Sequence, residues 1–581
     1  MSGSNYADDR GRIWQTWVSG AVAVLLGAAV MIAIYGLAPL DPRYQGWLYQ
    51  SWPRGGTPDP LQFWLGWTYF RHSPWMIPPG ANPDFGMELG TAIYFADAVP
   101  LLAMPLKAMR GVLDVPQYVG LWLLACGALQ GLLGWRLVAL ATRDPLARAC
   151  GAGLLALQPM LMHRMTGHTA LAGQWTLLAA LFLSLGPARG GRSGVAWGVL
   201  LAATALIHSY LLAMGTALWI ADWTRRTWIE AHGRGWRGPA LELAAVPAAV
   251  MAALWTGGFF LLRGGYDSGP GSDFGGYGTW GFNLLAFLDP GNWSVILPDL
   301  PDTGHWEGFG SNYLGLGGLL LLAAGALAFA LRPAPLPPRF LPLMGLLLAL
   351  LAFAVTHRVE VANHAWTLFE PPAWFLHVAG ALRNSTRMAW PLAYTLMIAA
   401  IAAAVRAWGG RRTGWLLLGL LGLQWVDLHP GIVARSSVFA GAPREVPERL
   451  SDPFWAEAVR TYTQIRAAPA ANAGPGWDAI GILAARAGLP TDCIYLARVD
   501  RATLAALRAK VRSILGSGAY EPGTLYVLRD EESLALARAS QDASRDLILQ
   551  ADGYWVLAPG WHQRQPPSPL RQNDGTRASA P

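Results

Sequence analysis

Acidic and aromatic side chains concentrate in one long connection near the N-terminus, and their chemistry suits a general base at a membrane surface. Asp59 opens the segment Asp59-Pro-Leu-Gln-Phe-Trp-Leu-Gly-Trp67, and Asp97 ends a later Tyr94-Phe-Ala-Asp97 segment. A carboxylate held beside a hydroxyl group can take its proton during a transfer reaction. Aspartate is also favoured as a helix N-cap, where it accepts hydrogen bonds from backbone N–H groups. For Asp59 both interpretations stay open: capping alone, or catalysis with or without capping.

Two clusters of basic side chains at expected helix ends have the chemistry of a phosphate site. The first is His163, Arg164 and His168, at the turn between two apolar stretches. The second is Arg383 and Arg387, which are four residues apart and would share one face of a helix. The planar guanidinium of arginine matches the oxygens of a phosphate group. The alternative for both clusters is interfacial anchoring, in which cationic side chains extend to the lipid headgroups.

The third long connection, 263–311, combines aromatic rings with amides and acids that include Glu307, and it runs into Asn312. Ring faces can stack on sugars while polar side chains bind their hydroxyl groups. The alternative is an ordered loop that only covers the helices. Its glycines neither follow a strand nor open a helix, which excludes a G-x-G-x-x-G nucleotide loop. His305 beside Glu307 is too small a set for a metal assignment. No cofactor is therefore predicted, and a divalent metal stays an open alternative.

The overall composition indicates that membrane helices must position these side chains. Of the 581 residues, 53% are hydrophobic and only 14% are charged, which is too apolar for ordinary soluble domains. The formal net charge is +7, but the basic residues stand in short loops without any run of Lys or Arg. This pattern is a topology signal and argues against nucleic acid as a partner. The cysteines Cys126, Cys150 and Cys493 are too scattered for a disulfide framework.

Apolar stretches near 20 residues recur over the first 430 positions, and each can cross about 30 Å of hydrocarbon. With the N-terminus in the cytoplasm, the short basic loops fall inside, and the long connections 39–116, 263–311 and 357–387 fall outside. Prolines and charges interrupt residues 93–113, so we expect an interfacial or re-entrant helix there. About eleven transmembrane helices are predicted, at 15–38, 117–140, 149–163, 169–187, 194–208, 209–223, 239–262, 312–331, 340–356, 388–405 and 414–430.

A composition change after Pro430 marks a second domain. Residues 431–565 alternate strand-like and helical segments with nearly balanced charge, which indicates a small α/β domain. The last predicted span ends outside, so this domain should be extracytoplasmic, and we expect it to fold as a separate unit. Its expected strands are Cys493–Val499, Thr524–Leu528 and a pair within Asp546–Leu557, and its expected helices are Arg501–Leu515 and Glu531–Ser540. The tail 566–581 is polar and should be disordered.

Four sequence blocks within residues 40–430 carry a resemblance to a known family. They are Asp59 to Trp67, the block that runs into Tyr94-Phe-Ala-Asp97-Ala-Val-Pro, Arg164…His168-x-Ala-Leu, and Leu-Pro-x-Leu-Pro…Glu307-Gly-Phe…Asn312-Tyr-Leu-Gly-Leu-Gly. These blocks resemble a bacterial multi-pass membrane family described only as a domain of unknown function.

The architecture of that family is similar to C-type (GT-C) membrane glycosyltransferases. The resemblance implies an essential acid in the first outside loop, interfacial helices, a periplasmic C-terminal domain and polyprenyl-phosphate-linked sugar donors. By that resemblance Asp59 takes the place of the loop acid. The chain departs from better-known members because it has neither an adjacent acidic pair early in the loop nor a His-Pro-Pro-Leu segment. Metal dependence therefore stays open.

The resulting hypothesis is a membrane glycosyltransferase of the bacterial inner membrane. It would move a sugar from a lipid-linked donor to a glycan, lipid or protein acceptor at the periplasmic face. The expected fold is mainly α, a GT-C-like helical membrane bundle over 1–430 followed by the small α/β domain. Asp59 is the expected catalytic base, and the expected substrate-binding residues are His163, Arg164, His168, Arg383, Arg387, Asp97, Glu307 and Asn312.

The alternative function is non-enzymatic, as a flippase, export subunit or scaffold for cell-envelope polysaccharide assembly. A transporter is expected to carry polar or broken helices near the bilayer midplane. The polar residues of this sequence gather instead at the outside ends of the predicted spans. This distribution favours an interfacial site.

Overall fold

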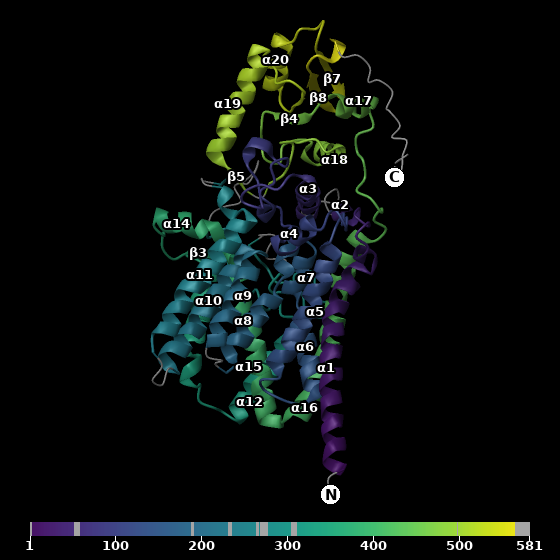
Figure 1. The fold of residues 1–581 in the computed structure, drawn as a ribbon. Coiled ribbons are helices and arrows are strands. Elements are labelled where there is room, and N and C mark those ends of the chain that lie inside the picture. The colour runs from purple at the N-terminus through teal and green to yellow at the C-terminus, as the bar shows by residue number, and fades with distance from the viewer. Residues whose placement is uncertain are drawn as a thin grey trace, which may run out of the picture.

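The computed structural model describes residues 3–50, 58–187, 191–230, 235–262, 266–267, 277–303, 311–496 and 498–563. Helices aligned along one axis form a bundle that carries an α/β domain at one end, and the N-terminal helix α1 begins at the opposite end (Figure 1). The helices of the bundle and its rim are α1 (Gly3–Tyr35), α2 (Trp47–Gln50), α3 (Asp59–His72), α4 (Pro100–Ala108), α5 (Val119–Val138), α6 (Pro145–Ala156), α7 (Pro159–Met165), α8 (Trp175–Leu185), α9 (Gly191–Ala205), α10 (Ser209–Thr224), α11 (Arg237–Gly257), α12 (Leu316–Leu331), α13 (Leu341–Val355), α14 (Ala373–Ala379), α15 (Trp390–Trp408) and α16 (Gly410–Phe439).

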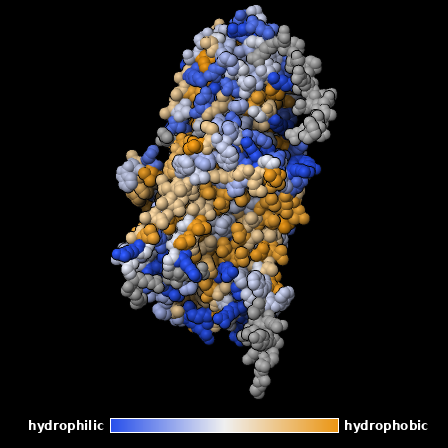
Figure 2. Space-filling model, viewed as in Figure 1, coloured by the Kyte–Doolittle hydropathy of each residue, from blue (hydrophilic) through white to orange (hydrophobic). Residues whose placement is uncertain are grey.

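Within the residues that the structure describes, six helical segments are long and apolar enough to cross a membrane, and they place the chain in one. They are Trp14–Tyr35, Val119–Val138, Arg237–Gly257, Pro338–Val355, Ser385–Trp408 and Gly410–Phe439. A belt of apolar side chains covers the middle of the bundle on the visible face (Figure 2). The predicted helical membrane bundle is thus confirmed. The number eleven stays a prediction, because α8, α9, α10 and α12 have only 11 to 16 residues each.

The predicted span 149–163 is divided between two helices. α6 ends at Ala156 and α7 begins at Pro159, with Gln158 in the N-cap position of α7. Proline has no N–H to continue the hydrogen bonding of α6, and its fixed φ suits the first turn of a new helix. Gln158 is buried and donates to the Leu154 carbonyl at 2.7 Å. The break gives α7 a direction of its own, and α7 carries Arg164.

Close packing of α1 against α5 depends on glycine. A Cβ added at Gly27 or at Gly127 would overlap the backbone carbonyl of the other residue. Small residues let membrane helices approach closely, which increases their van der Waals contact. The indole of Trp135 on α5 also donates to the Ser19 hydroxyl on α1 at 3.0 Å. These contacts fix α5, which continues directly from the first long connection.

The first long connection folds between the bundle and the α/β domain. All residues of α3 except its last are buried. Trp67 on α3 donates to the Val115 carbonyl at 2.8 Å, and Asn82 donates to the Gly66 carbonyl at 2.9 Å. α4 has nine residues, which is too short to cross a bilayer. This agrees with the expectation of a non-spanning helix within residues 93–113.

The C-terminal domain is built on a four-stranded sheet with the order β4-β6-β8-β7. β4 and β6 are parallel, whereas β6 with β8 and β7 with β8 are antiparallel. Its elements are α17 (Pro453–Thr461), β4 (Gln464–Ala468), α18 (Trp477–Ala487), β5 (Val499–Asp500), α19 (Arg501–Ser517), β6 (Thr524–Leu528), α20 (Glu531–Ser540), β7 (Leu547–Ala551) and β8 (Tyr554–Ala558). The small α/β domain is confirmed, including the segments predicted for β6 and α20.

Among the described residues of Cys493–Val499, the prediction of a strand is wrong except at Val499. The side-chain amide of Asn472 accepts from the Leu496 N–H and donates to the Leu496 carbonyl, both at 2.7 Å. These bonds occupy backbone groups that a sheet ladder would need. The short strand β5 instead pairs with β1 (Tyr266–Asp267) from the third long connection.

The α/β domain packs directly against the bundle, and its folding as a separate unit stays a prediction. One continuous core of buried residues includes Trp67 and Phe85 from the first connection together with Ile482 and Ile494 from the domain. The hydroxyl of Tyr69 also donates to the Leu489 carbonyl at 2.8 Å. Separating the domain would expose this apolar surface to water at a free-energy cost.

Candidate active site

Asp59 is the first residue of α3, and its side chain is 8% exposed. The N-cap position belongs to Pro58, which makes no capping hydrogen bond through its side chain. Asp59 is therefore not the N-cap, although its charge still benefits from the positive end of the helix dipole. Its Oδ2 lies 3.3 Å from Nδ1 of His168. The first connection and the α7–α8 turn thus bring a buried carboxylate against an imidazole.

Asp97 is the second acid of this site, and its environment differs from that of Asp59. It is half-buried beside the η5 turn (Thr169–Ala172), where the Thr169 hydroxyl and the Ala170 N–H donate to its Oδ2 at 3.4 and 3.5 Å. Burial raises the pKa of Asp97 well above its ordinary value, and the neighbouring Asp59 carboxylate raises it further. Asp97 therefore favours its neutral form, and the two acids are not equivalent.

Buried arginine side chains approach this end of the bundle from two further elements. Arg164 on α7 is 2% exposed, and its guanidinium lies 5.9 Å from the ring centre of Trp390. Arg387 lies in the short 3-10 helix η11 (Ser385–Ala389), with its guanidinium 4.9 Å from the Tyr210 ring. Aromatic faces stabilise a buried cation. Arg383, the partner predicted for Arg387, also lies close to it and to Tyr210.

His208 belongs to the same group, although the sequence did not indicate it as a site residue. It occupies the N-cap position of α10, where its Nδ1 accepts from the Tyr210 N–H at 3.2 Å. Burial lowers the pKa of His208 well below its ordinary value, and nearby positive charges lower it further. Those charges come from Arg387, His168, Arg498 and Arg164. His208 is thus a neutral imidazole whose remaining nitrogen carries the proton.

The C-terminal domain supplies two residues that sequence reasoning did not select. Arg498 donates to the Ala381 carbonyl at 2.7 Å, which joins the domain to the Arg383 segment. Burial raises the pKa of Tyr495, and so does the Asp59 carboxylate, whereas the Arg383 guanidinium lowers it. Tyr495 therefore lies within electrostatic reach of both predicted groups. No local pattern could have identified these residues, because they reach the site through tertiary packing.

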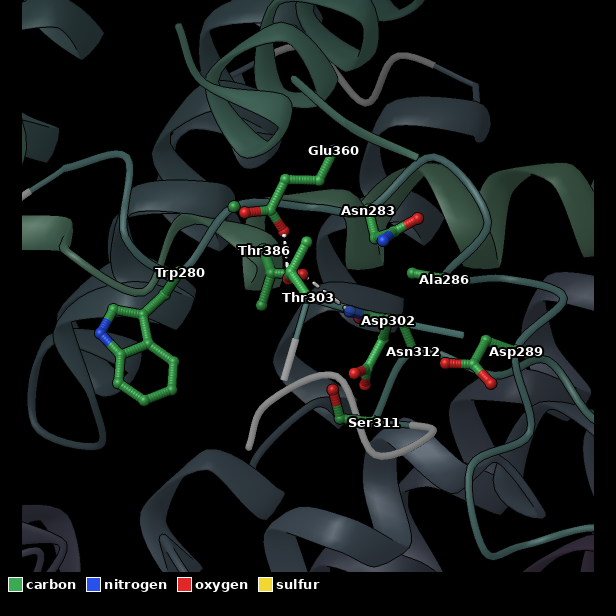
Figure 3. Close-up of a pocket in the computed structure, with 11 residues that line it drawn as sticks. Trp280, Asn283, Ala286, Asp289, Asp302, Thr303, Ser311, Asn312, Glu360 and Thr386 are labelled. Atoms are coloured by element: carbon green, nitrogen blue, oxygen red, sulfur yellow. Dashed lines mark hydrogen bonds between the residues drawn. The ribbon is translucent and has the colours of Figure 1, made fainter. Parts of the chain in front are cut away.

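A polar pocket adjoins this group through η11 (Figure 3). Thr386, the residue before Arg387, lines the pocket and accepts from the Asn312 amide at 2.8 Å. The oxygen of that amide accepts from the Trp390 indole at 3.1 Å. Across the pocket, Glu360 accepts from the Thr303 hydroxyl at 2.9 Å. The remaining lining residues are Trp280, Gly281, Asn283, Ala286, Asp289, Asp302 and Ser311.

The other predicted residues have less definite positions. His163 is half-buried on α7, directly before Arg164. Glu307 and His305 lie outside the described residues. Within the described ranges, no group of three His, Cys, Asp or Glu side chains is arranged to hold a metal ion.

Comparisons with solved structures find similar chains that include three structures of oligosaccharyltransferases from Archaeoglobus fulgidus. AglB in complex with an inhibitory peptide and a dolichol-phosphate is 12% identical, with 94% of this chain and 75% of that chain covered and a TM-score of 0.34. A complex with Zn and sulfate is 13% identical, with 92% and 73% covered and a TM-score of 0.35. A complex tethered to an acceptor peptide containing the NVT sequon is 13% identical, with 93% and 74% covered and a TM-score of 0.36.

Among curated proteins none matches the chain. Two family models do match: residues 24–429 fit the domain of unknown function DUF6311, and residues 454–559 fit the DUF6311 C-terminal domain. The two matches follow the division into bundle and α/β domain, and the chain belongs to the DUF6311 family.

Proposed function

We propose that this protein transfers a sugar from a polyprenyl-phosphate-linked donor to an acceptor hydroxyl or amide group at a membrane surface. The observation that carries the proposal is the convergence of the buried Asp59 and its partner His168 with Arg164, Arg387 and the neutral His208. A carboxylate beside several fixed cations suits a reaction in which a proton is removed while an anionic leaving group departs.

In the proposed step the acceptor oxygen or nitrogen attacks the anomeric carbon of the donor sugar. The bond from that carbon to the phosphate oxygen breaks, and the electron pair leaves with the lipid phosphate. Asp59 takes the proton of the acceptor, and the Nδ1 of His168, 3.3 Å from Asp59 Oδ2, holds the carboxylate in position. Arg164 and Arg387, with Arg383 beside them, would bind the departing phosphate, since guanidinium groups pair with phosphate oxygens in a planar, bidentate manner.

The polar pocket is the proposed place of the donor sugar. Its lining offers amide, hydroxyl and carboxylate groups together with the ring of Trp280, as hydrogen bonding to sugar hydroxyls requires. Thr386 joins this pocket to Arg387 along the chain. A sugar in the pocket would therefore lie beside a phosphate on the arginine cluster.

The proposed orientation places this end of the bundle on the periplasmic side of a bacterial inner membrane, with the N-terminus in the cytoplasm. Support comes from short arginine-bearing loops at the other end, where Arg332 and Arg406 donate to each other's carbonyl groups. Alkaline phosphatase fused after residue 440 should be active, and a fluorescent protein that matures only in the cytoplasm should be dark there. The opposite pair of results would reverse the orientation.

The test of the function is Asp59→Asn, measured as glycan transfer in membranes supplied with polyprenyl-phosphate sugar. Loss of the base should lower turnover by roughly 10²–10⁴-fold without lowering the melting temperature by more than a few degrees. Asp114→Asn is the matched control, because Asp114 belongs to the same connection and its side chain is 64% exposed. Near-normal transfer by the Asp59→Asn protein would remove Asp59 from the mechanism. Absence of transfer by the wild type with every donor tried would favour a flippase, export subunit or scaffold instead.

A further inference from the structure

The segment between α13 and α15 exposes large apolar side chains beyond the bundle. Strands β2 (Arg358–Val361) and β3 (His364–Thr367) form an antiparallel hairpin, and α14 follows. In Figure 1, β3 and α14 project from the side of the bundle near the end that carries the α/β domain. The exposed fractions are 52% for Trp366, 67% for Leu368, 61% for Phe369, 69% for Trp374 and 67% for Val378. Such a concentration within 13 positions marks an interaction surface.

This exposure is built into the fold, because the other side of the segment is firmly packed. The Tyr277 ring lies 4.8 Å from the Phe353 ring of α13 and 5.4 Å from the Phe375 ring of α14. At the tip of the hairpin, the Asn283 side chain donates to the Ala362 carbonyl at 2.8 Å and accepts from its N–H at 3.2 Å. Both ends of the projection are thus tied to the third long connection.

The packing of Phe375 inward determines which face of α14 is left outside. Trp374 and Val378 are four residues apart and share that outer face. The exposed His377 lies beside them and adds a polar group. A short helix with an aromatic and an aliphatic side chain on its outer face, next to a polar ring, has the character of an interfacial amphipathic helix.

We propose that β3 and α14 dock into the boundary between headgroups and acyl chains of the bilayer leaflet at this end of the bundle. Lipid is the proposed partner of this surface because the segment that carries it is continuous with membrane-crossing helices. The segment is suspended between Pro338–Val355 and Ser385–Trp408, so both of its ends leave the same rim of the apolar belt. In Figure 2 the projection stands at the edge of that belt. Tryptophan is favoured at this depth, because its indole has an apolar body and an N–H donor.

This surface is independent of the proposed reaction, but its position has a consequence for the site. α14 ends at Ala379, and Arg383 and Arg387 follow within the next turns of chain. Docking of α14 would therefore hold the arginine cluster near headgroup depth, where an anionic lipid phosphate resides.

The test uses site-specific fluorescence in liposomes. All three native cysteines are buried, so an introduced exposed cysteine can be labelled selectively with the polarity-sensitive dye NBD. Trp374→Cys reports on the proposed surface, and Val378→Cys provides a second reporter if the first variant folds poorly. Ser513→Cys, exposed on α19, is the aqueous control. Leu348→Cys, at a position 56% exposed near the middle of α13, is the deep control. Quenching is compared between phosphatidylcholine vesicles that carry a doxyl group at acyl carbon 5 and at acyl carbon 12.

We expect the label at position 374 or 378 to be quenched several-fold more strongly by the shallow doxyl group than by the deep one. The order should reverse at position 348, and position 513 should show no quenching. A label at position 374 or 378 that behaves like position 513 would overturn the proposal. A blue-shifted emission there without doxyl quenching would also overturn it. That result would indicate a protein partner, and a second copy of this chain if the shift disappears on dilution with lipid.

Discussion

At the scale of single residues, the two acids of the site show how position gives one residue type two different properties. The sequence could identify both Asp59 and Asp97 as candidates because they stand among aromatic residues in one long connection. It could not distinguish them, since the difference arises from the contacts that Asp97 makes with the η5 turn and from the neighbouring Asp59 carboxylate. Nor could it select His208, whose importance depends on basic side chains from three other segments.

Asp97→Asn should therefore lower the activity far less than Asp59→Asn does. Asparagine resembles a protonated aspartic acid in shape, and its carbonyl can still accept from Thr169 and Ala170. The backbone φ of Asp97 is +54°, a conformation that asparagine tolerates better than most residues. We expect transfer to fall by less than about tenfold, against the roughly 10²–10⁴-fold loss for Asp59→Asn. Equal losses in the two variants, measured with the same donor, would show that Asp97 acts as a charged group.

His208 should make the protein less stable in mild acid. Its pKa is lowered in the folded state, so below about pH 6.5 the unfolded chain binds a proton that the folded chain does not. The stabilising contribution is therefore present above that pH and is lost as the pH falls. His208→Gln, which retains a hydrogen-bond acceptor, should reduce the decrease in melting temperature between pH 7.5 and 5.5. An unchanged decrease in detergent-solubilised protein would argue against a buried neutral imidazole.

At the scale of elements, the sequence predicts helices and strands well where they are local and poorly where a tertiary contact decides. The segments of β6 and α20 follow from their own residue patterns. The division of 149–163 at Pro159 and the loss of the strand at Cys493–Val499 depend on how neighbouring segments use the backbone groups. The sequence predicted Asn312 as a site residue. It could not predict that Asn312 contacts η11, because that contact is long-range.

Asn312→Leu should loosen that association. The change removes the acceptor for the buried Trp390 indole and the donor to Thr386. Leaving a buried N–H unsatisfied costs on the order of 1–3 kcal/mol, so the melting temperature should fall. Because Thr386 directly precedes Arg387, the KM for the lipid-linked donor should rise more than kcat falls. Asn363→Ser, at the exposed turn of the β2–β3 hairpin, is the control and should change neither quantity. A lower melting temperature with an unchanged KM would restrict Asn312 to a purely structural role.

At the scale of the whole molecule, the α/β domain closes one end of the bundle and contributes Tyr495 and Arg498 to the site. The sequence predicted the existence of this domain from a composition change, but not its attachment, because the contacts join residues hundreds of positions apart. The ion-pair network around Arg466 shows the attachment most clearly. Its side chain is 2% exposed and lies between Asp492 of the domain, at 3.4 Å, and Glu88 of the first connection, at 2.9 Å.

Arg466→Met tests whether the network holds the domain in place. The substitution keeps much of the volume but removes the guanidinium that is paired with Asp492, which is 0% exposed. Breaking a buried pair in this way costs about 3–5 kcal/mol, so a large fall in melting temperature is expected.

Glu88→Gln removes the partner of Arg466 that belongs to the first connection. The Glu88 side chain is 41% exposed, so its loss should lower the stability far less, because water screens the exposed charge. If docking of the domain positions Tyr495 and Arg498, the Glu88→Gln protein should remain folded yet transfer sugar more slowly. It should also increase hydrogen exchange at the Thr491 N–H, which donates to the Asp84 carbonyl of the first connection at 3.1 Å. A folded Glu88→Gln protein with wild-type exchange and wild-type transfer would show that the apolar core alone fixes the domain.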